Sequence, residues 1–255
     1  MGKIIAVSNQ KGGVGKTTTA VNLAAALGQQ KKKTLLVDVD SQGSATSALG
    51  ESKKHITKTA YDVIMGNVSA ADAMRQTRFS NLWLIAGGAD LGGCEIELAD
   101  LERRELMLKK ALAPIRDVFD YILIDCPPAV GLIDINALSA SDSVLIPMQP
   151  EYFALEGLAQ LTNTISLVRR NNNATLEIEG VLITMYDSRL NLTHDVIEQV
   201  KQYFPRQIFK TVIPRSIRFS EAQSYGEPIT YFDKKSKGAD SYEALAKEII
   251  RRNKR

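Results

Sequence analysis

Short apolar segments alternate along the chain with longer segments in which apolar residues recur every three or four positions. Several short segments, such as residues 121–124, are apolar throughout instead of alternating with polar residues. Unbroken apolar strands are typical of a parallel sheet that is covered on both faces. The pattern predicts an α/β fold with a mainly parallel, twisted sheet and helices on both faces. The expected strands are residues 3–8, 34–38, 82–85, 121–125, 143–147, 178–184 and 210–213.

Helical spacing fills most of the segments between these strands. In residues 16–29, Leu23 and Leu27 lie four positions apart with Ala20 and Ala24 beside them, which makes one apolar stripe. The small side chains in this stripe favour close packing of the helix on the sheet. Further helices are expected at residues 95–118, 155–170, 192–203 and 241–252.

No linker, internal repeat or low-complexity segment divides the chain, so we expect one domain over residues 1–255. The glycine-rich residues 87–93 are interpreted as a loop after a strand. Residues 52–80 are polar and weakly patterned, and the sequence assigns no structure to them.

Composition narrows the class of protein. A hydrophobic content of 44% and a charged content of 24% are ordinary for a globular protein and argue against disorder or a collagen-like chain. The two cysteines, Cys94 and Cys126, exclude a disulfide scaffold and favour a reducing compartment. No apolar run reaches the ~18 residues of a membrane span, and the first residues turn polar too early for a signal peptide. We therefore expect a cytoplasmic protein.

The net charge of +3 is unevenly distributed. Residues 201–255 hold 13 Lys and Arg against 6 Asp and Glu. Such a basic region permits contact with nucleic acid, but charge alone favours an ordinary solvated surface.

The clearest chemical signal is a glycine-rich segment between an expected strand and an expected helix, which is the setting of a phosphate-binding loop. The strict pattern G-x-x-x-x-G-K-[ST] fails because its first glycine falls on Gln10, but a variant with an extra lysine, Lys11, fits. Lys16 would reach the β- and γ-phosphates, and the Thr17 hydroxyl would bind Mg²⁺. The candidate loop residues are Lys11, Gly12, Gly13, Val14, Gly15, Lys16, Thr17 and Thr18.

Carboxylates at two strand ends complete the expected nucleotide site. Asp125 follows the apolar residues 121–124 and would hold Mg²⁺ through water. Asp38 and Asp40 close the second strand. We assign Asp40 to the attacking water, with the metal as a further candidate partner, and Asp38 to the region beside the loop.

The variant loop that begins with Lys11 resembles that of the ParA/MinD family of P-loop ATPases. Later segments resemble the chromosome-partitioning ATPases of the ParA/Soj group, and the likeness runs through nearly the whole chain. These segments are residues 37–43 (VDVDSQG), 124–128 (IDCPP), 180–189 (GVLITMYDSR) and 212–216 (VIPRS).

The resemblance implies a nucleotide-dependent dimer with weak ATPase activity. ATP would be sandwiched between two subunits, with Lys11 reaching the phosphates of the partner and Gly12 crowded against it. Pro214 and Arg215 match the segment that lines the adenine pocket. Arg189 and Arg218 match arginines implicated in binding double-stranded DNA without sequence preference, which places the protein on the nucleoid. A ParB-like centromere-binding partner would stimulate hydrolysis and so drive chromosome or plasmid partitioning.

The sequence departs from the group at three positions. Ser41 stands where proline is usual, Ser44 where asparagine is common, and Gln223 where proline is frequent. Because Ser41 and Ser44 flank the expected water site, they put the hydrolysis rate in doubt rather than nucleotide binding.

A membrane-associated ATPase of the MinD type, positioning the division site, is the alternative function. It would need a terminal amphipathic helix with bulky apolar anchors. Leu245, Ile249 and Ile250 form a stripe, but it is short, and a helix docked on its own core explains it better. No membrane partner is expected.

Two further classes of P-loop protein remain open. An iron–sulfur ATPase could share four thiolates across a dimer, but Cys126 directly after Asp125 is typical of a small buried thiol. A ligase or kinase acting on a small metabolite would need an acceptor site, and no second constellation of reactive residues is evident.

Overall fold

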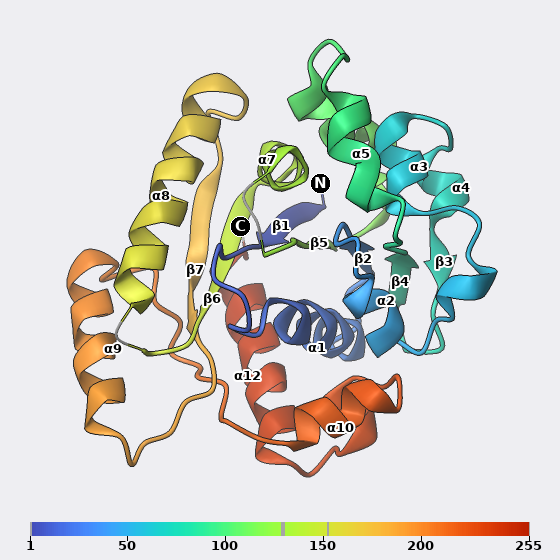
Figure 1. The fold of residues 1–255 in the computed structure, drawn as a ribbon. Helices are drawn as coiled ribbons and strands as arrows, with labels where there is room; N and C mark the ends of the chain where they lie inside the picture. The colour runs from blue at the N-terminus through green and yellow to red at the C-terminus, as the bar shows by residue number, and fades with distance from the viewer. Residues whose placement is uncertain (1, 129–130, 152, 255) are drawn as a thin grey trace.

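The computed structural model describes residues 2–128, 131–151 and 153–254, so the two ends of the expected domain lie outside the described residues. Within these ranges a seven-stranded sheet runs in the order β3-β4-β2-β5-β1-β6-β7 (Figure 1). All neighbouring strands are parallel except β3 and β4, which confirms the mainly parallel sheet. The strands are β1 (Lys3–Val7), β2 (Thr34–Asp38), β3 (Arg75–Gln76), β4 (Leu82–Ile85), β5 (Tyr121–Asp125), β6 (Ser143–Met148) and β7 (Glu177–Ile183).

Helices cover both faces of this sheet, as the sequence predicts (Figure 1). One face carries α1 (Lys16–Gln29), α2 (Ser44–Ala48), α10 (Arg218–Ser224), α11 (Ile229–Phe232) and α12 (Lys237–Arg252). The other carries α3 (Ala60–Met65), α4 (Ala70–Ala73), α5 (Leu91–Leu98), α6 (Met107–Leu112), α7 (Leu132–Ala140), α8 (Ala154–Asn171) and α9 (Asn191–Tyr203). Short 3₁₀ turns are η1 (Lys53–His55), η2 (Arg104–Leu106) and η3 (Ala113–Val118).

The two hydrophobic cores explain the unbroken apolar strands. In β5, Ile122 and Ile124 enter one core, whereas Tyr121 and Leu123 enter the other. Successive side chains of a strand point to opposite faces, so a strand with a core on each side needs apolar residues at every position.

The expected strand at residues 210–213 is wrong. The amides of Lys210 and Thr211 donate to the Glu248 carboxylate of α12, at 3.0 and 3.1 Å. The segment is tied to the sheet by isolated bridges, Val181 with Ile208 and Tyr186 with Pro214, and by the Ile213 amide, which donates to the Ile183 carbonyl of β7 at 2.8 Å. The Glu248 carboxylate therefore accepts the hydrogen bonds that the Lys210 and Thr211 amides would donate to a neighbouring strand.

The single helix expected at residues 95–118 is also wrong, because the segment is divided into α5, η2, α6 and η3. Arg103 adopts a left-handed conformation, with φ of 53°, directly before η2. The Asn136 side chain of α7 then accepts from the Leu108 amide at the start of α6, at 3.1 Å. α5 and α6 each bury leucines of their own, so the apolar spacing continues across the break between them.

Residues 52–80, which the sequence could not place, form η1, α3, α4 and β3. Thr59 and Asp62 make a reciprocal capping box at the start of α3. The Ser69 hydroxyl caps α4 by accepting from the Asp72 amide, at 3.1 Å. Local capping therefore defines short helices that are too brief for periodicity to reveal.

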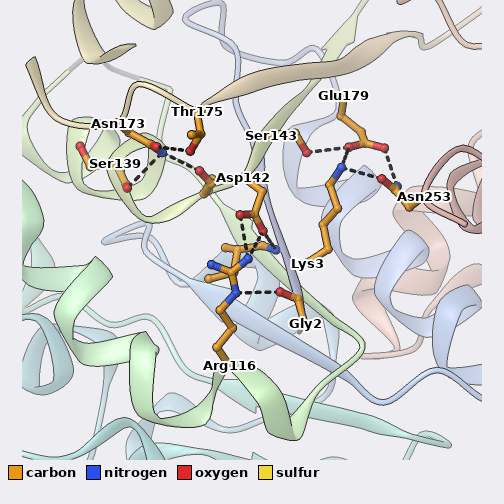
Figure 2. A network of polar contacts seen from close by, with 12 residues as sticks. Gly2, Lys3, Arg116, Ser139, Asp142, Ser143, Asn173, Thr175, Glu179 and Asn253 are labelled. Atoms are coloured by element: carbon orange, nitrogen blue, oxygen red, sulfur yellow. Dashed lines mark hydrogen bonds and ion pairs between the residues drawn. The ribbon is translucent and has the colours of Figure 1, made fainter. Parts of the chain in front are cut away.

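A buried polar network joins the strands near their amino ends (Figure 2). The Glu179 carboxylate of β7 pairs with Lys3 of β1 at 2.8 Å and accepts from the Ser143 hydroxyl of β6 at 2.6 Å. Asn253, just after α12, donates to the same carboxylate at 2.7 Å. Glu179 thus ties three strands and the chain's last helix together.

We predict that Glu179→Ala lowers the free energy of unfolding by about 3 kcal/mol, because it leaves buried donors and a lysine without their partner. Urea unfolding would measure the change. Glu198→Ala is the matched control, since Glu198 forms an exposed pair with Lys201 and should cost under about 1 kcal/mol. Equal losses in the two variants would contradict the structural role of Glu179.

Candidate nucleotide-binding site

The glycine-rich loop connects β1 to α1 at the carboxyl edge of the sheet. Gly13 and Gly15 have φ of 75° and 87°, in the left-handed region that residues with a Cβ rarely adopt. In the described structure no side chain caps the start of α1. The first amides of this helix therefore point into the loop, where the helix dipole favours an anion.

Contacts from two other strands hold the loop in place. The Thr184 hydroxyl, directly after β7, donates to the Val14 carbonyl at 2.8 Å. Asn9 accepts from the Lys11 amide at 3.0 Å and donates to the Pro147 carbonyl of β6 at 2.7 Å. The loop is thus fixed by tertiary contacts as well as by its glycines.

The two lysines of the loop lie in different environments. Lys16 is buried, and its ammonium donates to the Lys11 carbonyl at 3.1 Å. Burial lowers the pKa of Lys16, and the neighbouring Asp125 opposes this by favouring the charged form. Lys11 is half-exposed and forms an ion pair with Glu151 of its own chain, at 2.5 Å.

Asp125 is a buried carboxylate without a conventional partner. It ends β5, next to Val7 of β1 and Asp38 of β2. Burial raises its pKa well above the usual value, and the Asp38 charge adds to this, whereas the nearby Thr17 hydroxyl and Lys16 oppose it. Neither carboxylate oxygen makes a hydrogen bond of normal geometry among the described residues. A hard cation beside Thr17 would satisfy this carboxylate, so the residues fit Mg²⁺.

The two acids at the end of β2 differ in their contacts. Asp38 accepts from the amide and the hydroxyl of Thr46 in α2, at 2.8 and 2.7 Å, and burial raises its pKa. Asp40 accepts from the Gln42 amide at 2.9 Å and lines an open cavity. Asp38 therefore anchors α2, while Asp40 faces the space beside the loop.

This open cavity, which we call the phosphate cavity, has a volume of about 510 Å³. Glycines of the loop, Lys16, Thr17 and Thr18 line one side, and Asp40 and Ser44 line another. Among the described residues no group of three or more His, Cys, Asp or Glu side chains could hold a metal by itself. Mg²⁺ typically relies on one or two carboxylates together with water and phosphate oxygens, so it needs no larger cluster.

A second cavity of about 290 Å³, which we call the base cavity, adjoins the first. Pro214 and Arg215 line it, together with Ile213 and Phe219. Gly15 and Thr18 of the loop belong to both cavities. The structure thus brings the segment around Pro214, distant in sequence, beside the phosphate-binding loop.

Arg189 and Arg218 lie on the surface, and each is already paired with carboxylates. Arg189 is 85% exposed but forms a bidentate pair with Asp187, at 2.9 and 2.6 Å. This arginine lowers the pKa of Asp187 to about 2. Arg218 pairs with Glu221 at 2.6 Å and with Asp233 at 3.0 Å. Both arginines are thus locally neutralised, which the sequence analysis did not predict.

Comparison with known proteins places the chain in a family. A family model described as an AAA domain matches residues 2–178. The chain is 53% identical over 249 residues to the sporulation initiation inhibitor protein Soj of Bacillus subtilis, covering 98% of each chain. It is 49% identical over 253 residues to the chromosome partitioning protein ParA of Myxococcus xanthus, covering 99% of this chain and 89% of that one. This chain belongs to the ParA/Soj family.

Solved structures share the fold of this chain. A Mycobacterium smegmatis protein described as cobyrinic acid a,c-diamide synthase, with bound ADP and magnesium, has a TM-score of 0.87 and 36% identity, covering 98% of this chain and 95% of that one. The cell division ATPase MinD of Pyrococcus furiosus has a TM-score of 0.81 and 29% identity, covering 98% of this chain and 99% of that one. The predicted P-loop fold class is therefore confirmed.

The terminal helix of this ParA/Soj chain docks on its own core, as the sequence predicts. Leu245 and Ile249 are fully buried, and α12 packs against α1. The Tyr242 hydroxyl lies 3.3 Å from that of Thr19 in α1. Within the described ranges no helix combines the length and apolar character needed to cross a membrane.

Both thiols of this ParA/Soj chain are buried, and each lies in a hydrophobic core. Burial raises the pKa of Cys126 well above its usual value, and Asp134 and Asp125 add to this. A buried, protonated thiol is unsuited to share a cluster with a second subunit. The interpretation of Cys126 as a small buried residue is thereby supported.

Sequence reasoning missed three polar residues at this ParA/Soj site. Asp134 of α7 is buried and accepts from the Ser8 hydroxyl at 3.0 Å, while its other oxygen has no partner among the described residues. Lys53 lines the phosphate cavity, and Gln223 lines both cavities. Gln223 was noted only as a departure from the family, and nothing in the local pattern marked Lys53 or Asp134.

Asp134 supplies a prediction about pH. Burial raises its pKa to about 6. Between about pH 4 and 6 the folded protein therefore holds more protons than the unfolded chain, and its stability falls as pH rises. Asp134→Asn cannot titrate at this position, so the variant should not lose this stability as pH rises. In the absence of nucleotide, the free energy of unfolding of the variant minus that of wild type should therefore rise by about 3 kcal/mol between about pH 4 and 6.

Urea unfolding at several pH values would measure the difference. Asp195→Asn, at an exposed position of α9, is the matched control. A constant offset between wild type and Asp134→Asn would contradict the raised pKa.

Proposed function

We propose that this chain, acting as one domain over residues 1–255, is an ATP-dependent dimerising switch that binds nonspecific DNA on the nucleoid. It would hydrolyse ATP weakly until a ParB-like partner stimulates it, and so drive chromosome or plasmid partitioning. The observation that carries the proposal is the unpartnered, buried Asp125 carboxylate beside Lys16 and Thr17, in a chain about half identical to named partitioning proteins.

The two cavities support a placement in which each holds a different part of ATP. The triphosphate fits the phosphate cavity, where the loop amides and Lys16 supply positive charge. The adenine fits the base cavity, beside Pro214 and Arg215. Thr18 lies where the two cavities meet.

Thr17 and Asp125 would hold Mg²⁺, with Asp40 as a further candidate. When bound, the ion would neutralise phosphate charge that develops during hydrolysis. Asp40 faces the phosphate cavity and could orient a water toward the terminal phosphate. Ser44 lines the same cavity and so lies close enough to affect the hydrolysis rate.

Lys11 has a counter-ion, Glu151, in its own chain. To act on the partner's phosphates, as the family implies, Lys11 must exchange this carboxylate for a phosphate. The pair is half-exposed, so its rupture costs about 1 kcal/mol or less. A charged phosphate in a closed dimer interface can offset a cost of that size.

The MinD-like alternative is less well supported. An amphipathic anchor must offer its apolar face to lipid, whereas that face of α12 is buried against α1. The 36% identity to a protein described as a diamide synthase makes a ligase a second alternative function. Such an enzyme would need an acceptor before it turned over ATP, whereas the proposed switch needs only water.

We predict that Asp40→Ala still binds ATP and dimerises but hydrolyses ATP at least about a hundredfold more slowly, because the attacking water loses its orienting group. Phosphate release and light scattering after gel filtration would measure both properties. Asp240→Ala, an exposed position on α12, should match wild type. Normal turnover by Asp40→Ala would move the water-orienting role elsewhere.

DNA binding tests the proposal as a whole. Wild type should bind a random duplex only with ATP, and its affinity should fall steeply with salt because phosphate contacts release counterions. Arg189→Glu with Arg218→Glu should dimerise with ATP yet bind DNA at least about tenfold more weakly.

Two matched variants sharpen this test. Asp187→Asn, which frees Arg189 from its pair, should tighten binding, and Arg170→Glu on the exposed surface of α8 should alter it little. Wild type that binds no DNA with any nucleotide, but floats with anionic vesicles and ATP, would favour the membrane alternative.

A further inference from the structure

Lys53 is an exposed lysine of η1 whose side chain reaches back to the phosphate cavity. Of the described residues that line this cavity, Lys16 and Lys53 are the two with a positive charge. Lys16 belongs to the glycine-rich loop, whereas Lys53 follows α2 in the chain. An anion in the cavity therefore meets one cation from the loop and another from the segment after α2.

The backbone next to Asp40 holds the Lys53 side chain in place. The Lys53 ammonium donates to the Gln42 carbonyl. A Cβ atom on Gly43 would lie 2.9 Å from the Lys53 Cε atom, so this glycine leaves the room that the side chain needs. The Gln42 amide donates in turn to the Asp40 carboxylate at 2.9 Å. One short segment of backbone thus places Lys53 and Asp40 on the same side of the phosphate cavity.

Lys53 still has donors for an anion. A lysine ammonium carries three N–H donors, and the Gln42 carbonyl takes one of them. This carbonyl is neutral, whereas Lys11 is already paired with the Glu151 carboxylate. A phosphate oxygen can therefore join Lys53 without first displacing a counter-ion.

We propose that Lys53 binds the terminal phosphate of the nucleotide in its own subunit and makes the site prefer a triphosphate to a diphosphate. This inference rests on the proposed function, because it takes ATP as the ligand. With the adenine in the base cavity, the phosphates run from Thr18, which lines both cavities, past Lys16. Lys53 and Asp40 line the phosphate cavity but not the base cavity, so they meet the last phosphate of the chain.

The charge of Lys53 suits this role. ATP has one phosphate more than ADP, so a cation that reaches only this phosphate adds affinity to ATP alone. A hydrogen bond from an ammonium to a phosphate is about twice as strong as one between neutral groups. Because the same backbone segment holds Asp40, occupation of Lys53 by the terminal phosphate would also keep Asp40 beside it.

Titration with ADP and with a non-hydrolysable ATP analogue tests this assignment, at protein concentrations where light scattering shows a monomer. Lys53→Ala should weaken binding of the ATP analogue about tenfold, the value of one charge-assisted hydrogen bond, and leave ADP within about twofold. Lys53→Gln keeps an amide donor for the Gln42 carbonyl but removes the charge. It should weaken the analogue nearly as much as Lys53→Ala does.

Lys54→Ala is the matched control. Lys54 is exposed and is not among the described residues that line the cavity, so both affinities should stay as in wild type. Equal weakening of both nucleotides in Lys53→Ala, an unchanged affinity for the analogue, or wild-type binding by Lys53→Gln would each overturn the inference. Failure of the proposed function would look different, because wild type itself would then bind neither nucleotide.

Discussion

The site depends on a carboxyl group, Asp125, that the fold buries without a hydrogen-bonding partner of normal geometry among the described residues. The register of β2 and β5 places Asp38 and Asp125 side by side at the carboxyl edge of the sheet. Thr46 satisfies Asp38 by two hydrogen bonds, whereas the nearby Thr17 hydroxyl and the charge of Lys16 only partly offset the burial of Asp125. Keeping such a carboxylate charged costs several kcal/mol unless a cation joins it, which is why burial raises its pKa. The fold therefore retains a local cost that a ligand carrying a divalent cation would relieve.

The parts of the site that were predictable are those with a local cause. The glycines of residues 11–18 indicate the backbone conformation of the loop by themselves. The apolar strands are recognisable from the sequence, so the acidic residues at their ends could be placed at the edge of the sheet. Residues that reach the site only through tertiary contacts are not marked by any local sequence pattern. Lys53 comes from a segment without periodicity, and Gln223 from a short helix that the sequence did not reveal.

The errors in the predicted secondary structure have a related origin. At residues 210–213 the apolar pattern suited a strand, yet Glu248, distant in sequence, accepts the backbone amides there. At residues 95–118 a helical period ran on through three breaks, because α5, α6 and η3 bury apolar residues in the same core. Periodicity reports which face is buried, but it does not report where the backbone finds its hydrogen-bond partners.

The docking of α12 has a consequence for how the chain matures. The loop at residues 11–18 is made early in synthesis, but the base cavity beside it includes Tyr242, and α1 leans on α12. Glu248 of α12 also binds the amides of residues 210–211, and Asn253, just after α12, binds Glu179 of β7. The residues up to α12 must therefore leave the ribosome before the base cavity is complete.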